Sequence, residues 1–378
     1  MLERKWRKER TEISKQLLRA QSRSVSSLID EAKVLYYKAR IQDGSDADLF
    51  NVVNELLGKQ SVSPLPDHVN AVTLASDFSN FFSEKIAKIR RKLDDSRGEG
   101  DSVSQVQDSN VLNCLDSFRP VTTDEVKRLV LSLPSKSCNI DPIPTWLLKK
   151  CLDVLLPVIT RIINKSLECG EVPSSLKFAM VKPLLKKLSL DKDVLGNYRP
   201  VSNLAYLSKL IERVVAMRLN DHMSFHGMFD PNQSAYRKGH STETFLLKVC
   251  DDMLRAMDEG KEGILILLDL SSAFDTVDHD ILIERLETRI GLSGTVLQWF
   301  TSYLSGRKQC ILVQGSESDH VPLLYGVPQG SVLGPILFTI YSPPLGDNEV
   351  MRGTLPALHM TTSLWTPFAV VPRKKELK

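Results

Sequence analysis

Apolar residues recur at helical spacing through the first sixty residues, set among many lysines, arginines and glutamates. Apolar positions three or four residues apart predict an amphipathic helix. Those seen here are Leu17, Leu18, Val25, Leu28, Ile29, Ala32, Leu35 and Tyr36. The sequence SVSPLP at residues 61–66 breaks the pattern, and a second helical pattern runs over residues 72–93. The N-terminal quarter of the chain is therefore expected to be mainly helical.

A change of composition follows the second helical pattern. Residues 94–113 are polar, rich in Gly and Ser and free of aromatic residues, which is typical of a flexible linker. We therefore expect a helical basic segment over residues 1–93, a linker over 94–120, and a globular part from residue 121 onward.

The globular part mixes strand-like and helical patterns. Thr122, Thr123 and Asp124 offer an N-cap for a first helix. Further helices are expected at residues 145–156, from there to 169, and at 203–225, 242–257, 279–290 and 295–304. Strands are expected at residues 178–185 with a break at Pro183, at 264–268, and as a hairpin of 309–314 with 321–325. Strands and helices that do not strictly alternate favour an α+β fold.

Positive charge is concentrated although the net charge is only +3. The first 20 residues hold seven Lys or Arg against three Glu, and a second cluster comprises Lys85, Lys88, Arg90, Arg91 and Lys92. Basic faces of this kind suit a polyanion such as nucleic acid. A solvated helix face would look the same, so the two interpretations stay open for each cluster.

The six cysteines are scattered, without a CxxC pair and without clustered histidines. A zinc site is therefore not expected, and the thiols are read as reduced and mostly buried. The N-terminus lacks the apolar core of a signal peptide, and every long apolar run is interrupted by charge or Pro. We expect an intracellular protein of the cytoplasm or nucleus, with no membrane partner.

Residues 263–280, GILILLDLSSAFDTVDHD, carry the clearest chemical signal. A short apolar run ends on one carboxylate, Asp269, and Phe274 follows five positions later. A buried strand that ends on an Asp is a common way to hold a divalent metal ion over a phosphate. The alternatives are a solvated strand cap or ion-pair partner for Asp269 and a core aromatic for Phe274.

Two further segments offer groups suited to phosphate. Residues 327–335, VPQGSVLGP, form a loop punctuated by Gly and Pro that opens a helix, so its backbone can approach a ligand closely. Residues 197–203, NYRPVSN, contain Arg199 and follow Lys186 and Lys187, which gives one loop region three cations.

Taken together, these segments resemble a reverse transcriptase. LDLSSAFDTVDH resembles the first palm motif, NYRPVSNL the fingers motif, and VPQGSVLGP the following palm motif. QSAYRKGHSTET, at 233–244, resembles the segment between fingers and palm. KSCNIDPIPTWLLKK, at 136–150, resembles the N-terminal extension of polymerases from non-LTR, LINE-type retrotransposons.

This resemblance covers about residues 120–347, and residues 1–93 resemble the connector between endonuclease and polymerase in such elements. It implies right-hand fingers and a partial palm over 121–347, with an antiparallel sheet and helices.

The resemblance also assigns roles. Asp269, with the carbonyl of Leu270, would bind catalytic Mg²⁺, since two ions about 4 Å apart activate the primer hydroxyl and stabilise the leaving group. The cations would hold the triphosphate, and Phe274 would exclude a 2′-hydroxyl by steric clash. Nucleotide-binding roles fall on Lys186, Lys187, Arg199, Leu270, Phe274, Gln329 and Gly330. The implied partners are an RNA template, a DNA primer and deoxynucleoside triphosphates.

The tail departs from the family, whose next palm motif is an aromatic-x-Asp-Asp turn. At the corresponding place stand His359, Met360, Thr361 and Thr362, and residues 348–378 contain two Glu and no Asp. We expect the domain to be truncated before this motif, the tail at 348–378 to be non-homologous and disordered, and the palm strands to be unpaired. Mg²⁺ binding would then be impaired and the polymerase inactive. The alternative is a non-enzymatic nucleic-acid-binding or interaction protein of retrotransposon origin.

Overall fold

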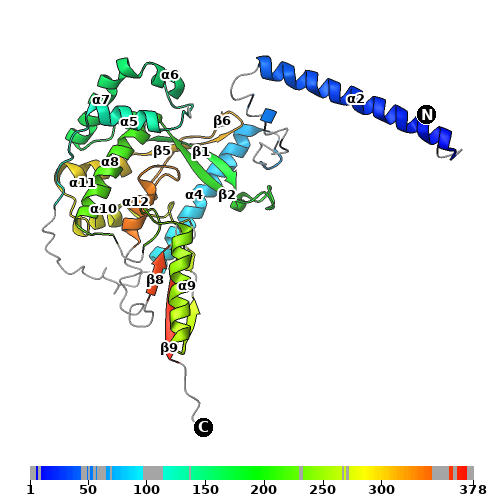
Figure 1. The fold of residues 1–378 in the computed structure, drawn as a ribbon. Coiled ribbons are helices and arrows are strands. Elements are labelled where there is room, and N and C mark those ends of the chain that lie inside the picture. Colours follow the sequence, from blue (N-terminus) through cyan, green and yellow to red (C-terminus); the bar gives the residue numbers. More distant parts are fainter. Residues whose placement is uncertain are drawn as a thin grey trace, which may run out of the picture. The chain divides into compact units, whose positions relative to one another are not determined.

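The main sheet of the protein joins two segments that lie far apart in the sequence (Figure 1). In the computed structural model β1 (Phe178–Leu185) pairs antiparallel with β2 (Tyr198–Leu204) and parallel with β5 (Lys308–Val313). The short strands β6 (Ser316–Glu317) and β7 (Val321–Pro322) both pair with β5. The structure describes residues 6, 10–43, 49, 52, 53, 57, 65–68, 70–96, 114–135, 138–229, 233–265, 268–269, 272–342, 357–360 and 364–372.

Two sequence predictions about this sheet were wrong. Pro183 does not interrupt β1, and the segment read as a loop at 197–203 is largely strand β2, so the following helix begins at Tyr206. Pro183 and Pro200 lie directly opposite each other in the ladder. Antiparallel ladders contain pairs that exchange no hydrogen bonds, and two residues without an N–H fit such a pair.

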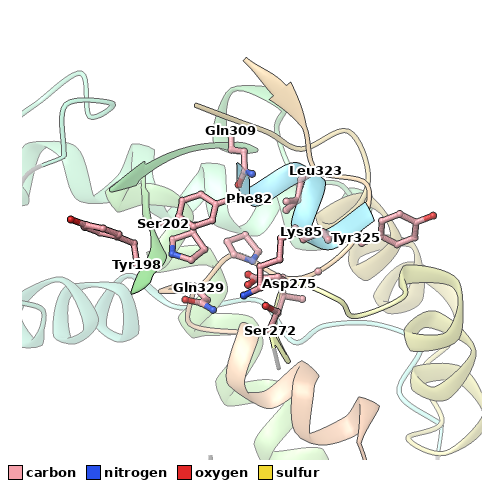
Figure 2. A pocket seen from close by; sticks show the side chains of 15 residues that line it. Phe82, Lys85, Tyr198, Ser202, Ser272, Asp275, Gln309, Leu323, Tyr325 and Gln329 are labelled. Carbon is pink, nitrogen blue, oxygen red and sulfur yellow. The ribbon is translucent and has the colours of Figure 1, made fainter. Parts of the chain in front are cut away.

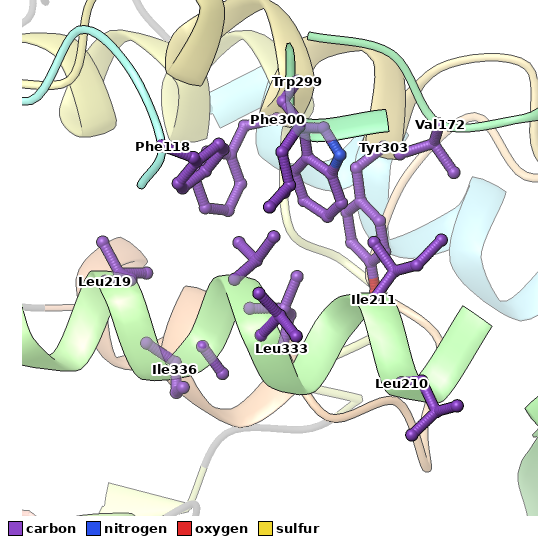
Figure 3. Close-up of a cluster of buried hydrophobic side chains, with 14 of the residues drawn as sticks. Phe118, Val172, Leu210, Ile211, Leu219, Trp299, Phe300, Tyr303, Leu333 and Ile336 are labelled. Carbon is purple, nitrogen blue, oxygen red and sulfur yellow. The ribbon is translucent and has the colours of Figure 1, made fainter. Parts of the chain in front are cut away.

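Helices pack around an aromatic core beside this sheet (Figure 3). Trp299 stacks on Tyr303 at 5.4 Å between ring centroids, and its indole N–H donates to Ser166. The predicted cap at Thr122 is confirmed, while the helix expected at 145–156 is divided at Cys151. The helices of this layer are α5 (Thr123–Ser132), α6 (Thr145–Lys150), α7 (Leu152–Cys169), α8 (Tyr206–Phe225), α10 (His279–Thr288), α11 (Gly294–Leu304) and α12 (Gly334–Tyr341), with 3-10 turns at Ser174–Leu176 and Leu195–Asn197.

The chain divides into two units between Leu65 and Pro66, earlier than the boundary predicted in the linker. Helix α4 (Ala71–Ser96) belongs to the second unit, where its Phe78 ring meets Tyr198 edge-on at 5.0 Å. The apolar stripe of α4 is therefore covered by the sheet, which composition could not reveal. In the first unit α2 (Glu12–Asp43) confirms the predicted helix, with Leu28 62% and Leu35 70% exposed.

A second ladder joins the strand before Asp269 to the tail. β3 (Lys261–Leu265) and β4 (Leu268–Asp269) both pair antiparallel with β9 (Leu364–Pro372). β8 (Ala357–Met360) also pairs antiparallel with β9. The pair Leu265↔Phe368 continues in register to Leu268↔Trp365, so β3 and β4 follow one ladder.

The expectations of a tail without regular structure and of unpaired palm strands therefore fail where β8 and β9 form. These strands are apolar and β-branched in part, and ladder hydrogen bonds come from the backbone.

Three smaller observations complete the fold. Helix α9 (Thr242–Asp258) packs beside β3 (Figure 1). Of the six cysteines, Cys310 is buried and Cys138 half-buried while the other four are exposed, so the expectation of mostly buried thiols was wrong. Among the helices that the structure describes, none combines the length and apolarity needed to span a bilayer.

Candidate nucleotide-binding site

Two adjoining cavities lie between α4, the β1–β2 end of the sheet and the loop before α12. The larger encloses about 1550 Å³, part of it open to solvent, and the smaller about 530 Å³. Figure 2 shows the smaller one from close by. Both are lined by Lys85, Tyr198, Pro200, Ser272, Asp275, Pro328 and Gln329, and the larger also by Lys186, Arg199, Phe274 and Gly330.

Two of the three predicted cations meet in the larger cavity. Lys186 follows β1 directly, and its backbone N–H donates to the Asn197 carbonyl, which closes the β1–β2 pair beside Arg199. Burial lowers the pKa of Lys186, and the nearby charges of Lys85 and Arg199 lower it further. Cations crowded in this way favour an anion between them. Lys187 is not among the residues that line either cavity.

The loop before α12 is fastened to the sheet by its backbone. Ser202 donates its N–H to the Gln329 carbonyl at 2.7 Å. Gly330 has φ +107°, and a Cβ there would lie 2.7 Å from the Ser202 carbonyl, so the position requires glycine. The sequence predicted that the backbone of this loop approaches a ligand, and the close neighbour that the structure shows is strand β2.

A buried carboxylate holds the other side of the same loop. Glu212 of α8 is 1% exposed and accepts hydrogen bonds from the N–H groups of Val332 at 2.7 Å and Leu333 at 3.2 Å. Burial raises the pKa of Glu212, although the nearby Arg307 charge and these bonds oppose the shift. Sequence reasoning missed Glu212, which lies in an apolar helical pattern with nothing to mark its partner.

Phe274 lies between the core and the larger cavity. Its ring packs on Phe338 at 5.0 Å between centroids, next to the core, and it also lines the larger cavity. Its carbonyl accepts from the N–H of Val327 at 2.8 Å, which ties it to the loop that carries Gln329.

Two charged groups in the cavities were not assigned to the site from the sequence. Lys85 extends from α4 toward Asp275 (Figure 2). Burial raises the pKa of Asp275 to about 6, and the Lys85 charge opposes that shift. Three residues further on, Asp278 caps α10 and pairs with Arg90.

Comparison with known proteins decides the family. Residues 185–347 match the model of the reverse transcriptase (RNA-dependent DNA polymerase) family. These residues are a reverse transcriptase domain of the LINE type. They include Lys186 and the residues of the site on β2 and in the loop before α12, whereas Lys85 lies outside them.

Two of the relatives come from mobile elements of Drosophila. The chain is 32% identical over 229 residues to a probable RNA-directed DNA polymerase from transposon BS of Drosophila melanogaster, covering 60% of this chain and 25% of that protein. It is 31% identical over 237 residues to the RNA-directed DNA polymerase from mobile element jockey of Drosophila funebris, covering 62% and 25%. The chain thus spans about a quarter of the length of these relatives.

Among solved structures, a truncated apo telomerase from Candida tropicalis is similar at TM-score 0.37 and 13% identity, over 52% of this chain and 44% of that one.

The metal expectation for this reverse transcriptase domain can be tested against its donor set. Asp269 ends β4, and the residue opposite it on β9 is Leu364. Strand β9 contains no acidic residue, and Asp275 is the one carboxylate among the residues given above as lining the cavities. Leu270 lies outside the described residues. A pair of Mg²⁺ ions requires oxygen ligands from several carboxylates, and the donors in the part of the chain that the structure describes do not fit such a pair.

Proposed function

We propose that this reverse transcriptase domain binds deoxynucleoside triphosphates and primer–template nucleic acid without extending the primer. The observation that carries the proposal is the convergence of Lys85, Lys186 and Arg199 with Phe274 on one cavity. Ligand sites commonly occupy cavities of roughly 300–1000 Å³, so the two adjoining cavities have room for a nucleotide.

The triphosphate would occupy the cationic side of the larger cavity. Lys186 and Arg199 come from the β1–β2 end, and Lys85 comes from α4 on the other side. A guanidinium binds phosphate oxygens in pairs, while the two ammonium groups act as point charges. The aromatic ring of Phe274 would lie under the sugar and discriminate against a 2′-hydroxyl by steric clash.

The inference that the domain does not extend the primer rests on the small number of carboxylates near Asp269. In a two-metal mechanism each ion is held by several oxygen ligands, and loss of ligands removes most of the rate. Asp269 faces an apolar strand residue across the ladder, and the tail that follows has no Asp. We therefore infer that this chain does not support a two-metal reaction.

The direct test measures binding and extension on the same preparation. Fluorescent deoxynucleoside triphosphate is titrated with and without a DNA primer on an RNA template, and extension is followed with Mg²⁺ or Mn²⁺. Binding that is weakened by Lys186→Ala, together with no extension, is the expected result. Templated extension would overturn the inactive part of the proposal, and absence of nucleotide binding would overturn the binding part.

A second candidate function is binding of nucleic acid alone, inside the cell in the cytoplasm or nucleus. It is favoured by Lys88 and Arg91, which are exposed on α4 away from the cavities. Phosphate contacts make binding fall steeply with salt. Salt-dependent binding of RNA that is insensitive to Lys186→Ala would favour this candidate.

A further inference from the structure

A cluster of three different metal-ligand types lies on the β5–β6 hairpin, apart from the nucleotide cavities. Strand pairing places Glu317 directly opposite Leu312. Cys310 lies two residues before Leu312 and therefore on the same face of the sheet. Diagonal neighbours on one face are within reach of a long side chain. The thiol of Cys310 is buried, and its Sγ lies 3.9 Å from Oε2 of Glu317.

His320 completes the cluster from the segment that follows the hairpin. Its ring packs against Phe178 of β1 with 4.7 Å between centroids, which holds it over this face. Its Nε2 lies 3.8 Å from the same Oε2 of Glu317. The ligand atoms of Cys310, Glu317 and His320 all lie within 4.8 Å of one another.

These separations are long for direct bonds but suit a shared ion. Strong hydrogen bonds between nitrogen and oxygen are about 2.7–3.2 Å long, so the Glu317–His320 contact is weak as it stands. An ion at the centre of such a triangle would lie roughly 2.2–2.5 Å from each atom, close to zinc–sulfur, zinc–nitrogen and zinc–oxygen bond lengths. One thiolate, one imidazole and one carboxylate suit Zn²⁺ or Co²⁺ and not Mg²⁺.

We propose that Cys310, Glu317 and His320 bind a divalent transition-metal ion, with Zn²⁺ as the best match. The fourth position faces solvent, because the side chains of His320 and Glu317 are 55% and 45% exposed. Gln309, the neighbour of Cys310, lines the smaller cavity from the opposite face of β5. The ion would thus fasten the hairpin behind a strand of the nucleotide site. Sequence spacing could not reveal this site, because strand register brings the three residues together.

The test uses Co²⁺ as a spectroscopic probe on the full chain. Thiolate coordination gives a charge-transfer absorption band, and we expect one Co²⁺ per chain, displaced by Zn²⁺. Cys310→Ser should abolish the band, and His320→Ala, at an exposed position, should weaken Co²⁺ affinity at least tenfold. Cys169→Ser, at an exposed cysteine elsewhere, is the matched control and should keep the band.

Circular dichroism of each variant separates loss of the ligand from loss of the fold. If Cys310→Ser fails to fold, the Co²⁺ affinities of the single variants His320→Ala and Glu317→Gln test the proposal. A band that persists in folded Cys310→Ser, Co²⁺ affinity that is unchanged in both His320→Ala and Glu317→Gln, or no Co²⁺ binding by the parent chain would overturn the proposal. Neither result depends on whether the cavity binds nucleotides.

Discussion

Arg90 of α4 and Asp278 at the start of α10 form an ion pair with an N···O distance of 2.5 Å, and their side chains are only 12% and 13% exposed. Asp278 also accepts from the N–H groups of Asp280 and Ile281, and Arg90 lies over the Tyr325 ring at 4.4 Å. One contact therefore joins the helix outside the matched domain to the segment that follows Phe274.

Arg90→Ala should lower the free energy of unfolding by about 3 kcal/mol, because it leaves the Asp278 carboxylate buried without its partner. Urea unfolding of the full chain measures this. Lys88→Ala, on the exposed side of the same helix, is the control and should change stability by less than about 0.5 kcal/mol. Equal losses of unfolding free energy in Arg90→Ala and Lys88→Ala would contradict a stabilising role for the Arg90–Asp278 ion pair.

Lys85→Ala should weaken binding of deoxynucleoside triphosphate about three- to tenfold, since one of three cations leaves the cavity. Fluorescence titration at two salt concentrations checks this, with Lys88→Ala again as the control. If Lys85→Ala binds like the parent chain while Lys186→Ala does not, α4 is only a structural neighbour of the site.

Asp275→Asn should stabilise the protein at pH 7.5 and leave it nearly unchanged at pH 4. The folded-state pKa of Asp275 is raised to about 6 by burial, so the folded protein is penalised as the pH rises from about 4 to 6 and the carboxylate ionises. A shift of about two units corresponds to roughly 3 kcal/mol at most, and we expect about 1–3 kcal/mol. Thermal unfolding across this pH range measures the stabilisation by Asp275→Asn. An equal stabilisation at pH 4 would show that ionisation of the buried carboxylate is not its cause.

Glu212→Ala should cost about 3–5 kcal/mol, because two N–H groups of the loop before α12 and the nearby Arg307 lose a buried carboxylate. Glu212→Gln keeps an acceptor oxygen and should cost less. Urea unfolding ranks the two, and the order Gln worse than Ala would show that the carboxylate does not hold the loop.

Patterns within one element were predictable, and pairings between elements were not. The helix expected at 72–93 is α4, and the helix expected at 295–304 is α11, because an apolar stripe is a local signal. That Phe78 of α4 meets Tyr198, and that Lys85 therefore enters the cavity, depends on packing between distant segments. Strand β2, which contains Pro200, was missed because strand propensity takes no account of the residue on the neighbouring strand, here Pro183.

In the candidate site, too, some residues could be predicted from motifs and others could not. Lys186, Arg199, Phe274, Gln329 and Gly330 were named from motifs and do line one cavity. Lys187 was named with them and lines neither cavity, and it lies beyond the end of β1. The metal roles of Asp269 and Leu270 stay predictions.

The ladder between β9 and the strand that ends on Asp269 has a consequence for how such a chain can diverge. Backbone hydrogen bonds accept almost any side chain, whereas metal coordination accepts very few. Backbone pairing of this kind can thus keep a sheet edge covered and protect the protein from aggregation, whatever ligands the paired strand supplies. Persistence of the fold and persistence of the chemistry are then subject to separate selection.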